Sequence, residues 1–144
     1  MLNVRNIMTK SVQTINRDTV ICEVDSVFNI HKISGVPLVD DSGRLVGFVS
    51  KSDISRFDAT GDDPNYARVY EIASPKVITI EPSASIAVAA QKMIHEHVHH
   101  LVVVEGAKMV GVLSTFDFVR IVAEIPMENQ ISNADINSTD DQEN

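Results

Sequence analysis

The sequence is poor in cysteine and in aromatic residues, and these shortages argue against several classes of protein. Its 144 residues include one cysteine, Cys22, no tryptophan, two tyrosines and five phenylalanines. A single cysteine supports neither a disulfide framework nor a paired-thiol zinc site. No apolar run approaches about eighteen residues, and no charged-then-apolar signal opens the chain, so neither a membrane span nor secretion is supported. We therefore expect a cytoplasmic protein.

Basic residues are outnumbered, and the acidic excess is unevenly placed. The formal net charge is −8, from 12 Lys and Arg against 20 Asp and Glu, and six of the acidic residues fall within residues 124–144. That polar segment lacks hydrophobic periodicity and any Lys or Arg, so we predict a disordered acidic tail. The remainder is nearly neutral and shows neither a basic patch for nucleic acid nor a polybasic membrane anchor.

The chain contains an internal repeat. With an offset of 65, VRNIMTKSVQTINRDTVI aligns with VYEIASPKVITIEPSASI, and with an offset of 64, LVGFVSKSDI aligns with MVGVLSTFDF. A segment containing Gly, Asp and Pro joins the two copies, as is typical of a linker. We predict a first motif at residues 1–58, a linker at 59–68, a second motif at 69–123 and the tail at 124–144.

The hydrophobic periodicity changes in the same order within each copy. A short alternating stretch predicts a strand, Asp18 or Ser83 is a candidate helix N-cap, and helical spacing follows. Two β-rich runs separated by a turn then predict a hairpin, and a last helix begins near Ser50 or Ser114. The predicted fold class is α+β, with two β-α-β-β-α repeats. Such repeats can bury their open sheet faces about a pseudo-two-fold axis, leaving paired clefts.

These residues resemble a tandem pair of CBS domains, the Bateman module. The resemblance rests on IMTKSVQTI with IASPKVITI, on SGVPLVD with HHLVVVE, and on GFVSKSD with GVLSTFD. It covers about residues 4–121. The resemblance implies a regulatory module that binds AMP, ADP, ATP or S-adenosylmethionine between its two motifs and that commonly forms a dimer.

Three pairs of matched residues carry the chemistry expected of such a cleft: Gly47 and Gly111, Ser50 and Ser114, Asp53 and Asp117. Glycine lets the backbone approach a ligand, and a helix N-terminus beginning at serine favours a phosphate. A carboxylate on the first turn can accept hydrogen bonds from ribose hydroxyls, each contributing about 1.5–3 kcal/mol. The alternative is ordinary capping, because S-x-x-D at a helix start also satisfies the helix terminus itself.

The family resemblance also implies which residues read the base. Thr14, Ile15, Thr79 and Ile80 correspond to positions that line an adenine pocket, although strand propensity alone would also explain them. Lys51 is the cation nearest the helix start of the first motif. Arg56 and Arg120 match each other; capping of helix C-termini is their expected role, and a dimer contact is the alternative.

Four of the five histidines precede the apolar run of the second copy. His99 and His100 align with Ser34 and Gly35, where the family often carries a basic pair facing phosphates. We expect both imidazoles to gain charge, and binding strength, as the pH falls toward about 6.5. His95 and His97 end a helix. A zinc site through His95 and His99 is the alternative, but a closed site needs four ligands.

No activated nucleophile, paired acid and base or Walker motif favours an enzyme. The first hypothesis is a sensor of adenine nucleotides that acts through a homodimer or a protein partner in trans. It requires no cofactor, although magnesium would help a nearly neutral module accept ATP. The alternatives are a structural module without ligand and a sensor of S-adenosylmethionine, which would use His99 and His100 less.

Overall fold

The computed structural model describes residues 1–126, so most of the predicted tail lies outside the described residues. The chain divides into two units, Met1–Ser114 and the part that begins at Thr115. The first unit contains every strand among the described residues, and the second contains the helix α5 (Thr115–Ala123).

The first unit contains two sets of elements in the same order, as the repeat predicts. The first set is β1 (Ile15–Asn16), α2 (Ile21–His31), β2 (Gly35–Val39), β3 (Leu45–Ser50) and α3 (Lys51–Thr60). The second set is β4 (Thr79–Ile80), α4 (Ile86–Glu96), β5 (His100–Glu105) and β6 (Lys108–Ser114). The predicted α+β class is confirmed. Two short helices that the sequence patterns did not reveal precede these sets: α1 (Val4–Ile7) and the 3₁₀ helix η1 (Val69–Glu71).

Each set forms its own three-stranded sheet. The strand orders are β1-β2-β3 and β4-β5-β6, with the first pair of strands parallel and the second pair antiparallel in both sheets. Both hairpins are therefore present. The register shifts between Leu38 and Val39 in one hairpin and between Val103 and Val104 in the other, so even the irregularity is repeated.

The predicted N-caps were wrong by two residues. The first long helix follows Val20, which makes no side-chain capping bond, and the second follows Ser85, whose hydroxyl accepts a hydrogen bond from the Val88 amide. In the first repeat, the later start of the long helix has a physical reason. The carbonyl groups of Arg17 and Thr19 accept hydrogen bonds from η1, so this stretch pairs with another segment instead of entering the helix.

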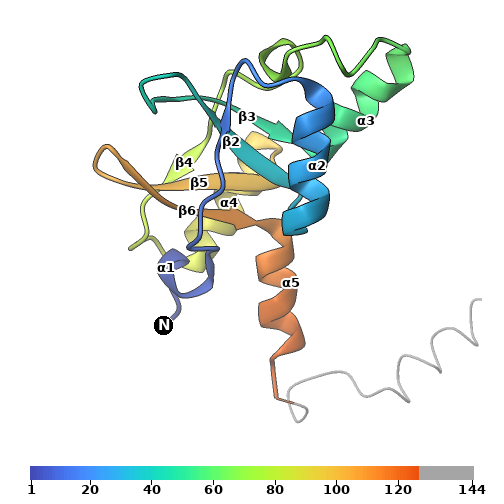
Figure 1. Ribbon diagram of the computed structural model, residues 1–144. Helices are drawn as coiled ribbons and strands as arrows, with labels where there is room; N and C mark the ends of the chain where they lie inside the picture. Colours follow the sequence, from blue (N-terminus) through green and yellow to red (C-terminus); the bar gives the residue numbers. More distant parts are fainter. Residues whose placement is uncertain (127–144) are drawn as a thin grey trace, which may run out of the picture. The chain divides into compact units, whose positions relative to one another are not determined.

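The lead-in helix of each repeat docks on the other repeat. The amides of Val69 and Tyr70 in η1 donate to Thr19 and Arg17 of the first repeat, at 2.8 and 3.1 Å. At the equivalent positions α1 docks on the second repeat: Val4 and Arg5 donate to Ala84 and Pro82, at 2.9 and 3.0 Å. The chain then runs from α1, beside β6, to β1 in the other sheet (Figure 1). This exchange ties the two repeats together.

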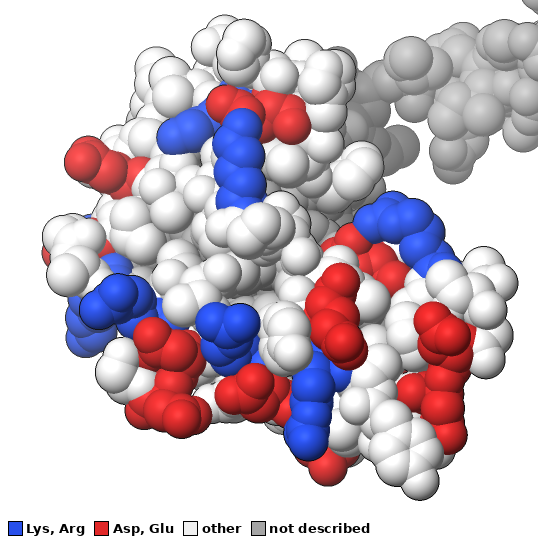
Figure 2. Space-filling view, turned by 90° about the horizontal axis from the view of Figure 1, so that it is seen from above, with Lys and Arg blue, Asp and Glu red and all other residues white. Residues whose placement is uncertain are grey.

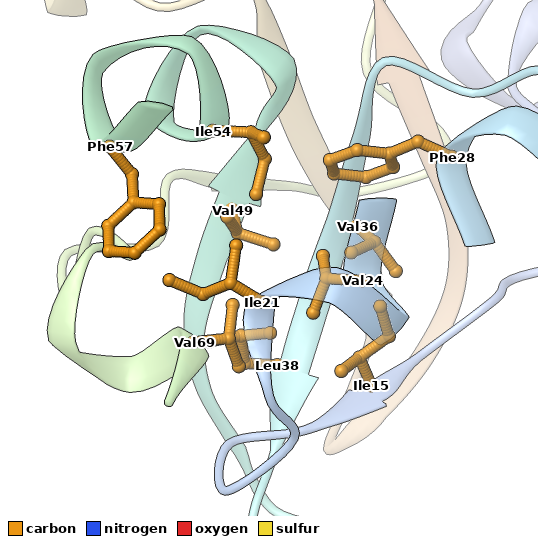
Figure 3. Close-up of a cluster of buried hydrophobic side chains, with 10 residues drawn as sticks. All are labelled: Ile15, Ile21, Val24, Phe28, Val36, Leu38, Val49, Ile54, Phe57 and Val69. Carbon is orange, nitrogen blue, oxygen red and sulfur yellow. The ribbon is translucent and has the colours of Figure 1, made fainter. Parts of the chain in front are cut away.

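The core of the first repeat includes a residue from the start of the second. Ten buried side chains form this cluster: Ile15, Ile21, Val24, Phe28, Val36, Leu38, Val49, Ile54, Phe57 and Val69 (Figure 3). Val69 of η1 is fully buried among them, as Figure 3 shows beside Leu38 and Ile21. Through Val69, η1 is therefore part of the core of the first repeat. Burial of a valine side chain contributes about 1.5–3 kcal/mol to stability.

Candidate functional site

A group of four side chains and backbone positions joins the two repeats near the expected cleft. We call Ser34, Gly35, Phe48 and His100 the cross-repeat cluster. The Ser34 hydroxyl lies 2.8 Å from Nε2 of His100, and the rings of Phe48 and His100 are 5.1 Å apart between centroids. A β-carbon at Gly35 would lie 3.0 Å from Nε2 of His100 and closer still to the Phe48 ring. Glycine at this position therefore leaves room for the imidazole of the other repeat.

The environment of His100 overturns one expectation. Burial, and then the neighbouring His99, lower the pKa of His100 from 6.5 to about 4, against a smaller opposing effect of Asp53. His100 is therefore neutral at pH 6.5 and does not gain charge there. Its neutral ring can exchange a hydrogen bond with Ser34, but it does not supply a positive charge for a phosphate at neutral pH.

The matched glycines face the polypeptide backbone of the other repeat. Phe48 and Ser74 exchange both backbone hydrogen bonds, at 2.9 Å each, and Thr9 and Val112 do the same at 2.9 and 3.1 Å. A β-carbon on Gly47 would lie 3.0 Å from the Ser74 carbonyl oxygen. Gly111 has the same relation to the Thr9 carbonyl oxygen, also at 3.0 Å. Close packing of the two repeats thus explains both glycines without a ligand.

Asp53 combines the capping role with a second contact. The amide and hydroxyl of Ser50 donate to Oδ2 of Asp53, at 2.8 and 3.0 Å, and Asp53 returns a longer amide bond to the Ser50 hydroxyl. The guanidinium of Arg56 forms an ion pair with Oδ1. The capping alternative is therefore realised in the first repeat. The Arg56 side chain is 72% exposed, so Oδ1 lies beside a guanidinium that remains accessible to solvent.

The second unit contains the same pair of residues. Nη1 of Arg120 lies 3.3 Å from Oδ1 of Asp117, whose side chain is 4% exposed. Both arginines were expected to cap helix C-termini, and that expectation was wrong, because each pairs with the aspartate three residues before it. The signal was present in the sequence as a repeated D-x-x-R, one helical turn in length.

A pocket of about 660 Å³ opens next to Asp53 in the first unit. The helix α3 contributes Asp53, Arg56 and Phe57, and the linker and η1 contribute Asp62, Asp63 and Glu71, among others. Asp53 is the one predicted site residue in its lining. Asp53 lines this pocket and also interacts electrostatically with His100 of the cross-repeat cluster.

The residues predicted to read adenine lie in or directly before the two short strands β1 and β4. The Ile15 side chain belongs to the hydrophobic core of the first repeat. Ile80 is also buried, at 6% exposure, whereas Thr14 is exposed. The carbonyl oxygen of Thr79 accepts a hydrogen bond from Nζ of Lys92. Core packing and strand formation account for the two isoleucines.

The remaining predicted residues lie on the surface or at the sheet edge. Lys51 is the exposed first residue of α3, and His99 is exposed just before β5. Ser114 ends β6 opposite His100, in the same position that Ser50 takes opposite Gly35. Residues 1–126 contain no group of three or more His, Cys, Asp or Glu side chains placed to hold a metal ion. Within this range no helix is long and apolar enough to cross a membrane.

The family model of the CBS domain matches the chain twice, over residues 4–59 and 69–124. The chain belongs to the CBS domain family. This CBS pair is 29% identical over 118 residues to the CBS domain-containing protein YhcV of Bacillus subtilis, covering 81% of this chain and 83% of YhcV. Together the two repeats form a CBS-pair regulatory module.

A solved structure supports the same assignment. The CBS domain pair of protein MJ0100, in complex with 5′-methylthioadenosine and S-adenosyl-L-methionine, has 27% sequence identity to this chain and a TM-score of 0.77. The match covers 85% of this chain and 97% of that one. The chain spans 42% and 24% of two other curated relatives, protein MJ1225 of Methanocaldococcus jannaschii and homoserine O-acetyltransferase of Methanohalobium evestigatum.

Proposed function

We propose that this CBS pair is a non-enzymatic regulatory module that binds an adenosine-containing ligand beside Asp53 and, in the second repeat, through Asp117. The observation that carries the proposal is the position of Asp53. Its carboxylate lies at the first turn of α3, beside a pocket of about 660 Å³ and beside residues of the other repeat. A ligand held there would contact both repeats, so its binding would favour one arrangement of the module.

Ribose recognition follows from the chemistry of this carboxylate. Oδ2 is occupied by Ser50, whereas Oδ1 meets only the exposed guanidinium of Arg56 among its recorded partners in residues 1–126. Two vicinal hydroxyls could donate to Oδ1 in place of Arg56, at about 1.5–3 kcal/mol for each charge-assisted bond. The 5′-methylthioadenosine and S-adenosyl-L-methionine bound to the MJ0100 pair contain such a ribose.

The candidate ligands divide by charge. AMP, ADP and ATP, the last with magnesium, were the first hypothesis from the sequence, and S-adenosylmethionine was the alternative. The related MJ0100 pair supports an adenosine derivative with a sulfur-containing 5′ substituent. A structural module without a ligand is the competing function, because the glycines and serines are also explained by packing and capping.

A face of α5 supports output through a homodimer or a partner protein. Phe116, Val119 and Val122 are spaced three residues apart, and their side chains are 57%, 57% and 63% exposed. The repeat alignment places Ser52, Ser55 and Asp58 of α3 at the same three positions. Because the same fold accepts polar residues there, the apolar face of α5 is not required for folding and suits a protein contact.

Binding is expected to depend on the two aspartates. In isothermal titration with AMP, ATP with magnesium, 5′-methylthioadenosine and S-adenosylmethionine, the wild type should bind at least one ligand at micromolar concentration. The double variant Asp53→Ala, Asp117→Ala should bind that ligand at least about tenfold more weakly at each site, because each loses a charge-assisted hydrogen bond.

The control is Asp58→Ala, which removes an exposed carboxylate from the same helix as Asp53. It should bind as the wild type does, and circular dichroism should show that all three proteins are folded. Failure of the folded wild type to bind any of these ligands up to millimolar concentration would favour the structural module instead.

A further inference from the structure

The pocket beside Asp53 has an acidic rim and an apolar base. Phe57 is buried, and Ala67 and Ile72 are partly buried, so these three side chains provide apolar surface for a base or an alkyl group. Three exposed carboxylates, those of Asp62, Asp63 and Glu71, line the same pocket. Figure 2 shows acidic side chains spread over this face, including its right-hand side, the side on which α3 lies in Figure 1.

The rim carboxylates are not neutralised by neighbouring cations. Asp63 accepts hydrogen bonds from the backbone and side-chain amides of Asn65, and Glu71 accepts one from the backbone amide of Arg68. Within residues 1–126, none of the three rim residues forms an ion pair. The backbone and amide groups donate hydrogen bonds to Asp63 and Glu71, but these neutral donors do not cancel the negative charges.

Positive charge is scarce in the lining of the pocket, which does not include Lys51. Arg56 is the one Lys or Arg in the pocket lining, and its guanidinium is paired with Asp53 itself. His100, on the other side of Asp53, is neutral at pH 7 because burial lowers its pKa to about 4. With Asp53 and Arg56 cancelling each other, the rim retains three negative charges.

We propose that the Asp53 pocket selects adenosine derivatives whose 5′ substituent is neutral or cationic, such as a thioether or a sulfonium, over adenosine 5′-phosphates. This inference rests on the proposed function and specifies its ligand class. Three carboxylates repel the two or more negative charges of a 5′-phosphate and attract a sulfonium. Across water each pair of unit charges interacts only weakly, so the several pairs together decide the preference.

The test compares ligands that share adenosine and differ in charge. Isothermal titration at low and physiological salt would use S-adenosylmethionine, its uncharged-sulfur analogue S-adenosylhomocysteine, 5′-methylthioadenosine, AMP and ATP. Asp117→Ala in all samples restricts binding to the Asp53 pocket. We expect S-adenosylmethionine to bind at least about tenfold more tightly than AMP, with a ratio that decreases as salt increases.

A charge variant and a matched control locate the effect. Asp62→Asn, Asp63→Asn, Glu71→Gln removes the rim charges and keeps oxygen atoms that accept the bonds from Asn65 and Arg68. It should reduce the preference for S-adenosylmethionine over AMP about tenfold or more. The control Glu23→Gln, Asp25→Asn, Asp58→Asn makes the same change in net charge at exposed residues outside the pocket lining, and should leave the preference unchanged.

The outcomes separate the inference from the proposed function. Binding of AMP or ATP at least as tightly as S-adenosylmethionine would overturn the inference and leave the proposed function standing. If the rim variant and the wild type showed the same preference for S-adenosylmethionine over AMP, the inference would also fail and the proposed function would also stand. If the folded protein bound none of the five ligands, both would fail.

Discussion

Replacing Val69 by aspartate is expected to lower the free energy of unfolding by about 4 kcal/mol or more. Val69 is fully buried in the core of the first repeat, although the sequence places it at the start of the second. The new carboxylate would have no charged partner in that cluster, and natural domains are stable by only about 5–15 kcal/mol. Urea denaturation followed by far-UV circular dichroism measures the change.

A control and a milder variant localise the effect. Tyr70, the next residue, is 45% exposed, so Tyr70→Asp should cost about 1 kcal/mol or less. Val69→Ala should keep the protein folded and accelerate amide hydrogen exchange in β1 and α2 of the first repeat. Acceleration confined to β5 and β6 would contradict the exchange of lead-in helices.

The contribution of His100 to stability is expected to disappear between pH 6.5 and pH 4. Its pKa is about 4 in the folded protein, against 6.5 ordinarily, so in this range the unfolded chain takes up a proton that the folded chain does not. The stability contribution is therefore full above pH 6.5 and is lost as the pH falls. The shift corresponds to about 3 kcal/mol.

The measurement is urea denaturation across this pH range for the wild type and for His100→Gln, which can still bond Ser34 but does not titrate. The difference between the two proteins in free energy of unfolding should change by about 3 kcal/mol. His95→Gln, at an exposed histidine, should follow the wild type. A parallel pH dependence in wild type and His100→Gln would show that His100 is not buried as the structure has it.

Much of the fold was predictable because its signals are local and repeated. Alternation, helical spacing and turn residues predicted the hairpins and the long helices, and the offset between copies predicted two equivalent units. The N-caps were missed because Arg17 and Thr19 bond to η1, which lies about fifty residues further along the chain. Sequence periodicity within one repeat contains no information about a segment that docks from the other. The motif limits, including the linker at 59–68, stay predictions.

The site was predictable only in part. The S-x-x-D motif correctly indicated the start of α3, and Asp53 lies beside a pocket. The charge of His100 was misjudged because the alignment suggests a cation beside a phosphate, whereas burial against Phe48 and Ser34 keeps the ring neutral. The rim residues Asp62 and Asp63 follow α3 and Glu71 ends η1, and folding alone brings all three to Asp53.

A ¹H–¹⁵N correlation spectrum of the wild-type protein, titrated separately with S-adenosylmethionine and with AMP, shows directly where an adenosine ligand binds. If an adenosine ligand binds beside Asp53, the largest saturable amide shifts should fall on residues 50–57 and 71–74, with smaller shifts at Ser34 and His100. Saturable shifts confined to other parts of the chain, or no shifts with either ligand at millimolar concentration, would contradict the placement of the ligand at Asp53.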